Sequence, residues 1–198
     1  MSLNVKEIFY SLQGEGERQG EASIFIRLAG CNLKCDFCDT DFSGGTKMEL
    51  SDIEAAISNY PCQWLIWTGG EPALQLTAVD TAFLKQKGYR QAIESNGHYP
   101  LPEGLDYTVV SPKGNVGYAA KVNPIVDEIR LPVRVGDRLP DISILPKAKY
   151  YFVSPVFNDI LATNVESTED NIAYCVELVR QNPQWRLSLQ IHKLINIE

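Results

Sequence analysis

The sequence predicts an α/β protein whose largely parallel strands form an incomplete (partial) TIM-like barrel. Strand-like and helix-like segments alternate along the chain. About six to seven strand-like segments are accompanied by only about three helix-like ones. Polar turns marked by glycine or proline follow several strands in succession. Such a barrel stays open on one side, and ligands of these folds bind at the carboxyl ends of the strands. We expect residues 1–198 to form a single domain.

The expected strands are short apolar runs bounded by turn residues. They cover residues 23–29, 63–68, 91–94, 107–110, 128–131, 150–153 and 185–192. The connection between residues 94 and 107 is too short and too rich in proline to hold a helix.

Capping residues mark the expected helices. Ser51 begins a helix that Pro61 ends, Thr77 begins one that Gly88 ends, and Ser167 begins one that runs to about Arg180. In the second of these helices, the spacing places Val79, Ala82 and Phe83 on the inward face.

Composition excludes several classes of protein. The formal net charge of -7 argues against a general nucleic-acid surface, which is usually basic. No apolar run reaches the roughly 20 residues of a membrane span, and Lys6 and Glu7 interrupt the N-terminus too early for an export signal. Five cysteines, an odd count, indicate reduced thiols rather than a disulfide framework. We therefore expect a cytoplasmic protein.

Three cysteines lie close together in the sequence, at Cys31, Cys35 and Cys38. This spacing lets one loop hold three corners of a cubic iron–sulfur cluster, where ferredoxin-like sites use four cysteines. The iron without a protein ligand would be open to a small molecule. A structural zinc site with Cys62 as fourth ligand is an alternative. Otherwise we expect Cys62 and Cys175 to be buried and to pack as small hydrophobic residues.

Three strand ends carry polar turns. Thr68-Gly69-Gly70-Glu71-Pro72 offers free backbone groups to a ligand's amino group, with Glu71 able to order the turn. Glu94-Ser95-Asn96-Gly97 supplies an acid and an amide. Ser111-Pro112-Lys113 supplies a hydroxyl and an ammonium group that suit a carboxylate. Each motif alone also fits an ordinary turn, but their succession after the cysteine loop is typical of a cofactor-binding rim.

Together these motifs resemble those of radical S-adenosylmethionine enzymes. Four further segments resemble, more narrowly, the 7-carboxy-7-deazaguanine synthase family. They are the segment from Glu7 to Gly16, then Arg27, Asp39-Thr40-Asp41-Phe42 and Leu189-Gln190-Ile191-His192-Lys193. The resemblance covers nearly the whole chain, although residues 115–146 carry little of it.

The resemblance implies a ring contraction of 6-carboxy-5,6,7,8-tetrahydropterin to 7-carboxy-7-deazaguanine with release of ammonia, on the route to queuosine and other 7-deazapurines. It implies a 4Fe-4S cluster, S-adenosyl-L-methionine and Mg²⁺ as cofactors. A radical from the cofactor would carry the reaction, so no catalytic side chain is expected. It also implies a homodimer and an electron donor such as flavodoxin or ferredoxin.

The resemblance assigns a role to each site residue. The cluster would be held by Cys31, Cys35 and Cys38, and Mg²⁺ by Thr40. The cofactor would contact Gly70, Glu71, Glu94, Ser111, Pro112 and Lys113. The pterin would contact Leu12, Gln13, Gly14, Glu15, Arg27, Thr68, Gln190 and His192.

Several of these assignments have a plainer alternative. Arg27 suits the substrate carboxylate, but it could instead pair with a protein acid such as Glu15. Gln190 and His192 would share one face of the last strand by alternation. The short cysteine spacing is also shared with enzymes that activate glycyl-radical proteins, and a non-catalytic iron–sulfur or zinc-binding module is a further alternative.

Overall fold

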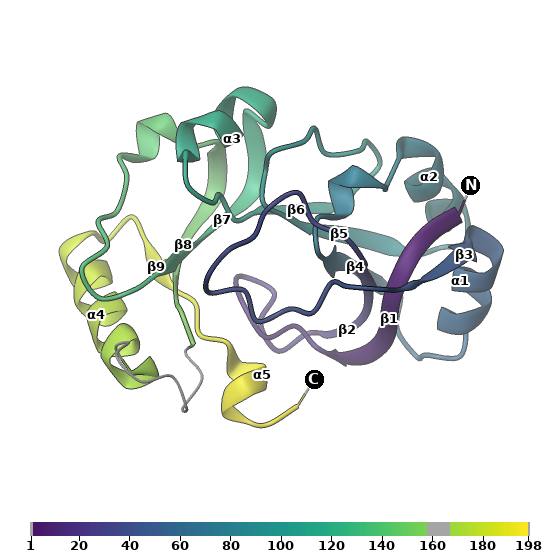
Figure 1. Ribbon diagram of the computed structural model, residues 1–198, viewed down its shortest axis with the longest axis horizontal. Helices are drawn as coiled ribbons and strands as arrows, with labels where there is room; N and C mark the ends of the chain where they lie inside the picture. The colour runs from purple at the N-terminus through teal and green to yellow at the C-terminus, as the bar shows by residue number, and fades with distance from the viewer. Residues whose placement is uncertain (1, 158–166, 198) are drawn as a thin grey trace.

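The computed structural model describes residues 2–157 and 167–197, which form one curved, open sheet with most of its helices on the outer side (Figure 1). The strand order is β3-β1-β2-β4-β5-β6-β7-β8-β9. From β2 to β9 neighbouring strands run parallel, while β1 and β3 extend the sheet antiparallel. The predicted α/β class with an incomplete barrel is confirmed.

The elements follow one another along the chain as β1 (Ser2–Leu12), β2 (Ala22–Leu28), β3 (Thr46–Glu49), α1 (Leu50–Ile57), β4 (Trp64–Gly69), α2 (Ala78–Gln86), β5 (Arg90–Ser95), β6 (Tyr107–Val110), α3 (Val116–Val122), β7 (Ile125–Val133), β8 (Lys147–Pro155), α4 (Thr168–Gln181), β9 (Arg186–Leu187) and α5 (Ile191–Leu194).

Every predicted strand is present, but the last one is much shorter than expected. The strand predicted over residues 185–192 is only Arg186–Leu187, and residues 191–194 form helix α5. The Ser188 N–H still donates to Val153 O of β8 (2.9 Å), but the chain then turns away from the sheet and the Ile191 N–H donates to Gly14 O instead (3.0 Å). The sequence did not predict β1 and β3, which lie outside the parallel part of the sheet.

The structure confirms the predicted first residue, or N-cap, of two of the three helices. Thr77 and Ser167 begin α2 and α4, each accepting a backbone hydrogen bond from an aspartate three residues on. The prediction for α1 was wrong, because Glu49 rather than Ser51 is its N-cap and pairs reciprocally with Asp52. That helix also ends at residue 57, four residues before the predicted stop.

The inward face of α2 differs from the prediction. Val79 is 68% exposed, whereas Thr81 and Leu84 are fully buried. The helix is rotated because the Thr81 hydroxyl lies 2.6 Å from Glu103 O and Leu84 packs into the core. The predicted inward position was therefore wrong for Val79 and Ala82, whereas Phe83 is partly buried and packs against the core as predicted.

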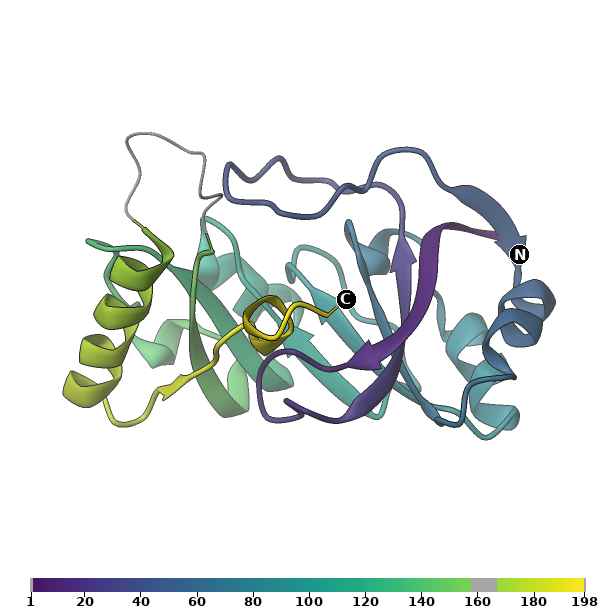
Figure 2. The same ribbon diagram turned by 90° about the horizontal axis from the view of Figure 1, so that it is seen from below.

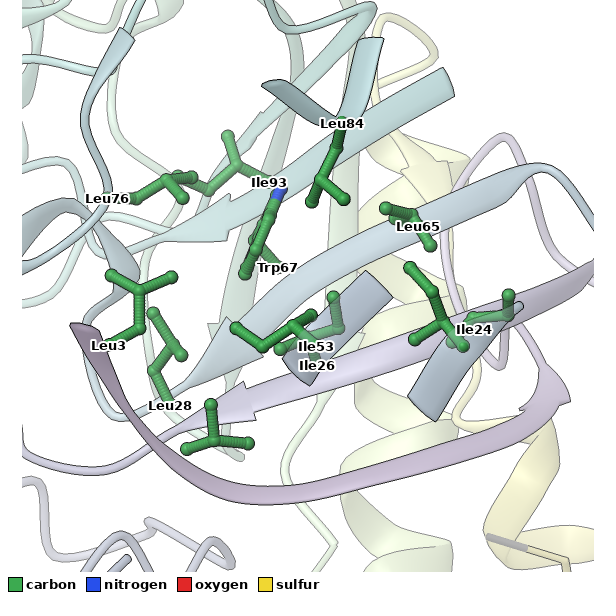
Figure 3. Packing of buried hydrophobic residues seen from close by; sticks show 12 residues of the cluster. Leu3, Ile24, Ile26, Leu28, Ile53, Leu65, Trp67, Leu76, Leu84 and Ile93 are labelled. Carbon is green, nitrogen blue, oxygen red and sulfur yellow. The ribbon is translucent and has the colours of Figure 1, made fainter. Parts of the chain in front are cut away.

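Alternation along the strands separates an apolar outer face from an inner face that carries both the polar site residues and a small apolar cluster around Phe25 and Ile66. The outward side chains of the first half of the sheet pack against α1 and α2 (Figure 3). This cluster contains Leu3, Val5, Ile24, Ile26, Leu28, Ile53, Ile57, Leu65, Trp67, Leu76, Leu84 and Ile93. A second cluster, which includes Cys175 and Trp185, fills the space between β7, β8 and α4. Inward positions are thereby left to residues such as Arg27, Thr68 and Glu94.

The turn between β1 and β2 reaches across the open side of the barrel to its last strands. Besides the bond from Ile191 to Gly14 O, the Gly16 N–H donates to Ser188 Oγ (2.8 Å) and the Glu17 N–H to Glu128 Oε2 (3.1 Å). Figure 2 shows α5 lying beside this turn. Among the helices of residues 2–157 and 167–197, none is both long enough and apolar enough to cross a membrane.

Candidate functional site

A cavity of about 630 Å³ opens at the carboxyl ends of the parallel strands. Its wall brings together all of the predicted site residues except Glu71 and Pro112. The lining residues from the prediction are Leu12, Gln13, Gly14, Glu15, Arg27, Cys31, Cys35, Cys38, Thr40, Thr68, Gly70, Glu94, Ser111, Lys113, Gln190 and His192. Segments that are far apart in the sequence therefore meet around one space.

The loop that follows β2 carries the three cysteines to the cavity. All three line it, with Cys38 exposed and the other two half-buried. The Leu33 N–H donates to Cys31 Sγ (3.4 Å). Burial raises the pKa of Cys35, although the nearby Lys113 ammonium opposes that shift. The loop thus presents thiols to the same space as the strand-end residues.

The donor set suits an iron–sulfur cluster better than a single ion. Three soft thiolates on a short loop match cluster ligation. Within the described residues, no three His, Cys, Asp or Glu side chains converge to hold one metal ion. Thiolates of a cubic cluster bind different irons, so this convergence is not required of them.

The zinc alternative required Cys62 as fourth ligand, and the structure contradicts it. Cys62 lines a separate groove at the amino end of β4, with Trp64 and Arg90. The cysteine loop contacts the opposite end of that strand, where Gly70 lies. A six-residue strand spans roughly 20 Å. Cys62 is half-buried, whereas the prediction of a buried thiol is confirmed for Cys175, the pKa of which burial raises to about 12.

The glycine turn after β4 packs against the start of the cysteine loop. A Cβ on Gly70 would lie 1.9 Å from Gly30 O, so only glycine fits there. The neighbouring Glu71 N–H donates to the same Gly30 oxygen (2.9 Å). Gly70 itself lines the cavity, which keeps its backbone available to a ligand.

Glu71 does not reach the cavity. It is fully buried, and its carboxylate accepts hydrogen bonds from Ser95 Oγ (2.8 Å), Asn96 N (2.7 Å) and Ala73 N (3.0 Å). Burial raises its pKa, while these hydrogen bonds oppose the shift. Glu71 therefore joins the turns after β4 and β5. Pro112 also lies outside the cavity lining. The structure therefore does not support a direct contact of Glu71 or Pro112 with the cofactor.

The Gln-Gly-Glu-Gly segment forms one wall. Gln13 Nε2 donates to Glu94 Oε1 (3.0 Å), and Thr68 Oγ1 donates to Glu94 Oε2 (3.2 Å). A Cβ on Gly14 would lie 1.9 Å from His192 Nδ1, so the glycine allows His192 to pack against this wall. Burial lowers the pKa of His192, and the neutral ring can both donate and accept.

Arg130 is the residue that the sequence analysis missed. It is 6% exposed and contacts three carboxylates: Nη1 with Glu94 Oε1 (3.0 Å) and Glu15 Oε2 (3.3 Å), and Nη2 with Glu128 Oε1 (2.8 Å). Burial opposes its charge, but the three carboxylates outweigh that effect and raise its pKa. Burial likewise opposes ionisation of Glu94, yet Arg130 holds the Glu94 pKa below 4.5. Alternation over residues 128–131 could have placed Glu128 and Arg130 together on the inward face.

Arg27 lines the cavity from β2, where it is in register with Thr68 of β4. Its Nε donates to Glu7 Oε1 (2.6 Å), so its protein partner is Glu7 and not Glu15. Among the described residues, no hydrogen bond involves its terminal nitrogens, and the side chain lines the cavity. Phe9 and Phe25 stack beside it, with ring centroids 4.8 Å apart.

The remaining predicted residues complete the rim. Lys113 Nζ donates to Ser111 Oγ (2.7 Å), and burial lowers the Lys113 pKa. Thr40 Oγ1 donates to Asp39 Oδ1 (3.4 Å). Gln190 is the N-cap of α5 and His192 lies within that helix. Both face the cavity, so the juxtaposition was predicted correctly, although the strand alternation offered as its reason was wrong.

An open parallel barrel, a three-cysteine loop across its carboxyl edge and a glycine turn against that loop define the class of radical S-adenosylmethionine enzymes. Comparison with known proteins narrows the class. Similar proteins named 7-carboxy-7-deazaguanine synthase occur in Bacteroides thetaiotaomicron (41% identical) and Bordetella pertussis (36% identical), each with full coverage of both chains. The chain belongs to the 7-carboxy-7-deazaguanine synthase family.

The fold agrees with a solved structure. A crystal structure of QueE from Escherichia coli superimposes with a TM-score of 0.71 at 24% identity, covering 96% of this chain and 94% of the other. No protein-family model matches the chain. The relatives are named as synthases, so the comparisons give no support to a glycyl-radical activase or a non-catalytic module.

Proposed function

We propose that this chain converts 6-carboxy-5,6,7,8-tetrahydropterin into 7-carboxy-7-deazaguanine with release of ammonia. One observation supports this above others: a single cavity joins three thiols, an acceptor wall and an arginine. Gln13, Glu15 and Glu94 supply oxygen acceptors, and Arg27 lines the same cavity from β2, where it is in register with Thr68 of β4. A pterin presents N–H donors along one edge and this substrate carries a carboxylate at the other end.

The residues of the chain would bind and orient this substrate. Glu94 and Glu15 would accept hydrogen bonds from the pyrimidine edge, and Gln13 would add its amide. The Arg27 guanidinium would bind the substrate carboxylate, for which its planar fork is suited. Phe9 and Phe25 would cover the ring and exclude water. His192, held against Gly14, would supply a neutral polar contact.

The cysteine loop would hold the cofactors at the rim of the same cavity. The ligands of a 4Fe-4S cluster would be Cys31, Cys35 and Cys38, and S-adenosylmethionine would lie beside Gly70, Ser111 and Lys113. When bound, these groups supply the radical that removes hydrogen from the substrate. Binding energy and correct placement are the contribution of the protein.

An anaerobic assay tests this proposal. Reconstituted protein with S-adenosylmethionine, a reductant and the carboxytetrahydropterin should produce 7-carboxy-7-deazaguanine, detected by mass spectrometry. Cys35→Ala should lose both the cluster and the product, because it removes one of three thiolate ligands. Cys62→Ala, the matched control, should retain both, because Cys62 lies at the other end of β4. Full activity of Cys35→Ala or cluster loss in Cys62→Ala would contradict the assignment.

The same assay separates the proposed reaction from an activase. The rearrangement is redox-neutral, so S-adenosylmethionine should be regenerated. Stoichiometric methionine and 5′-deoxyadenosine per product would argue for a mechanism that consumes it.

We further propose a Mg²⁺ ion held by Thr40 and the substrate carboxylate. Mg²⁺ prefers oxygen ligands and keeps several waters, so one hydroxyl plus substrate oxygens forms a plausible set. Thr40 lines the cavity next to the cysteine loop, which supports this placement. Asp39 and Asp41 lie on either side of it and pair with lysines instead.

Thr40→Ala should keep the cluster spectrum, weaken the stimulation by Mg²⁺ and lower turnover by roughly 10- to 100-fold, because the substrate is less well placed. Thr40→Ser keeps the oxygen and should lose much less. The measurement is rate against Mg²⁺ concentration for the three proteins. An unchanged Mg²⁺ response in Thr40→Ala would move the metal site elsewhere.

We also propose that the protein is cytoplasmic, forms a homodimer and receives electrons from a flavodoxin or ferredoxin. The five free cysteines support a reducing compartment. The dimer and the electron donor rest on the family alone.

A further inference from the structure

The cysteine loop is joined to the rest of the protein by three ion pairs. Its three aspartates each contact a cation outside the loop. Asp36 Oδ2 lies 2.9 Å from Arg134 Nη1 and Asp41 Oδ2 lies 2.6 Å from Lys6 Nζ, while Asp39 pairs with Lys193. Every aspartate of this short loop is therefore paired.

The three cations come from separate parts of the fold. Lys6 belongs to β1, Arg134 directly follows β7, and Lys193 belongs to α5. These elements surround the cavity on different sides, and Figure 2 shows the loop passing above α5. The contacts thus hold the loop from several directions.

Besides the ion pairs, the loop receives hydrogen bonds from Asn96 Nδ2 to Asn32 Oδ1 (2.9 Å), from Asn4 Nδ2 to Gly44 O (3.1 Å) and from Glu71 N to Gly30 O (2.9 Å), which lie in its first part and at its two ends. Residues 30–45 contain no helix or strand. The backbone bond from Gly30 N to Phe42 O (2.8 Å) closes the base of the loop, and Cys38 N to Cys35 O (3.2 Å) forms one turn inside it. Lys6 Nζ adds a bond to Ser43 O (3.0 Å). The Arg134 guanidinium also lies over the Phe37 ring, 5.3 Å from its centroid.

We propose that Lys6, Arg134 and Lys193 are positioning residues that anchor the cysteine loop over the cavity before any cluster binds. Three carboxylates on one short loop repel one another, and they would also repel an anionic cluster bound by its cysteines. Cations placed beside the carboxylates remove that repulsion and restrict the loop to the conformation that presents the thiols. Only the link to the cluster rests on the proposed function, because the anchoring is a property of the chain itself.

Thiol alkylation of the cluster-free protein tests the anchoring. The rate for each cysteine is followed by mass spectrometry of its peptide. In Lys6→Gln/Arg134→Gln/Lys193→Gln, Cys31 and Cys35 should react about tenfold faster or more, because one exposed pair contributes up to about fivefold and three act together. Cys175, on the buried face of α4, should not change and reports on global unfolding.

Two controls separate anchoring from general charge effects. Arg180→Gln removes an exposed pair with Glu177 on α4 and should leave the thiol rates unchanged. Rising salt should speed alkylation of Cys35 in the wild type, since salt screens exposed pairs. The same salt should have little effect on the triple variant.

If the triple variant unfolds, so that Cys175 reacts, a second variant tests whether the loop is anchored. Arg134→Gln alone breaks the pair with Asp36 and leaves every charge of the loop itself in place. Loss of a nearby cation cannot increase the thiolate fraction of Cys35, so a rate about two- to fivefold faster would report loosening of the loop. Unchanged thiol rates in Arg134→Gln, or in a folded triple variant, would overturn the proposal.

The reconstituted protein gives an independent result. Iron should pass to a chelator several-fold faster from the triple variant than from the wild type or Arg180→Gln. Absence of any cluster in the wild type would instead contradict the proposed function. In that event the alkylation rates would still decide whether the loop is anchored.

Discussion

Arg130→Met is expected to lower the free energy of unfolding by about 3–5 kcal/mol, because it leaves three buried or half-buried carboxylates without their shared cation. Glu128 is fully buried, and Glu15 and Glu94 lie within 3.3 Å of the same guanidinium. Denaturant unfolding followed by circular dichroism measures the loss. Arg180→Met, which breaks an exposed pair, should cost less than about 1 kcal/mol.

A second substitution should partly rescue the first. Glu128→Gln in the Arg130→Met background removes one uncompensated buried charge and keeps an acceptor for the Tyr107 hydroxyl, which donates to Glu128 Oε2 (3.0 Å). The double variant should be more stable than Arg130→Met alone. If Arg130→Met lost no more stability than Arg180→Met, Arg130 would not be needed to compensate the three carboxylates in the folded protein.

The difference in stability between the wild type and Arg130→Met should depend on pH in one direction. In the wild type the pKa of Glu94 lies below 4.5, so its contribution to stability is present above pH 4.5 and is lost as pH falls through the lowered pKa. Without Arg130, burial should raise that pKa above 4.5, so protonation then stabilises the folded variant. The difference in stability between the wild type and Arg130→Met should therefore shrink on acidification. A gap that widens toward low pH would contradict the assigned role of Arg130.

Gly70→Ala should remove most of the activity by displacing the cysteine loop. The new Cβ would meet backbone atoms, at 1.9 Å from Gly30 O, 2.4 Å from Gly30 C and 3.0 Å from Cys31 N, so the chain itself must move. A misplacement of about 1 Å can cost roughly 100-fold in rate, and we expect turnover to fall by about that much. Stability should fall by only about 1–3 kcal/mol, as for other overpacked sites.

Iron content per chain, turnover and unfolding measure these effects separately. Gly117→Ala is the matched control, because its Cβ would meet Asn115 Oδ1 at 3.6 Å, an ordinary contact, inside helix α3. That variant should retain iron and turnover. Wild-type iron content and rate in Gly70→Ala would show that the glycine turn does not set the position of the loop.

The parts of the site that lie in continuous motifs were accessible from the sequence. Cys31, Cys35 and Cys38 act through their spacing along one loop, and the glycine turn follows a buried strand. Because parallel strands end at the same edge, motifs after successive strands meet whatever the exact register. The capping boxes of α2 and α4 are likewise local, since the bonds join residues three apart.

Pairing between distant residues depended on the tertiary structure. Arg27 pairs with Glu7 because β1 and β2 run antiparallel with these residues opposite each other, and no local signal selects Glu7 over Glu15. Glu71 looked like a ligand contact, but it turns away from the cavity to join two strand ends.

The sequence by itself determined the fold class and the loop that carries the thiols, because those follow from local periodicity and spacing, and the resemblance of its motifs indicated the family. Only the tertiary structure placed Arg130 among three carboxylates, moved His192 from a strand to a helix and paired the loop's aspartates with Lys6, Arg134 and Lys193. Such contacts join residues that are distant in the chain. They arise from the curvature of the sheet and from the turn that brings its last residues back to its first.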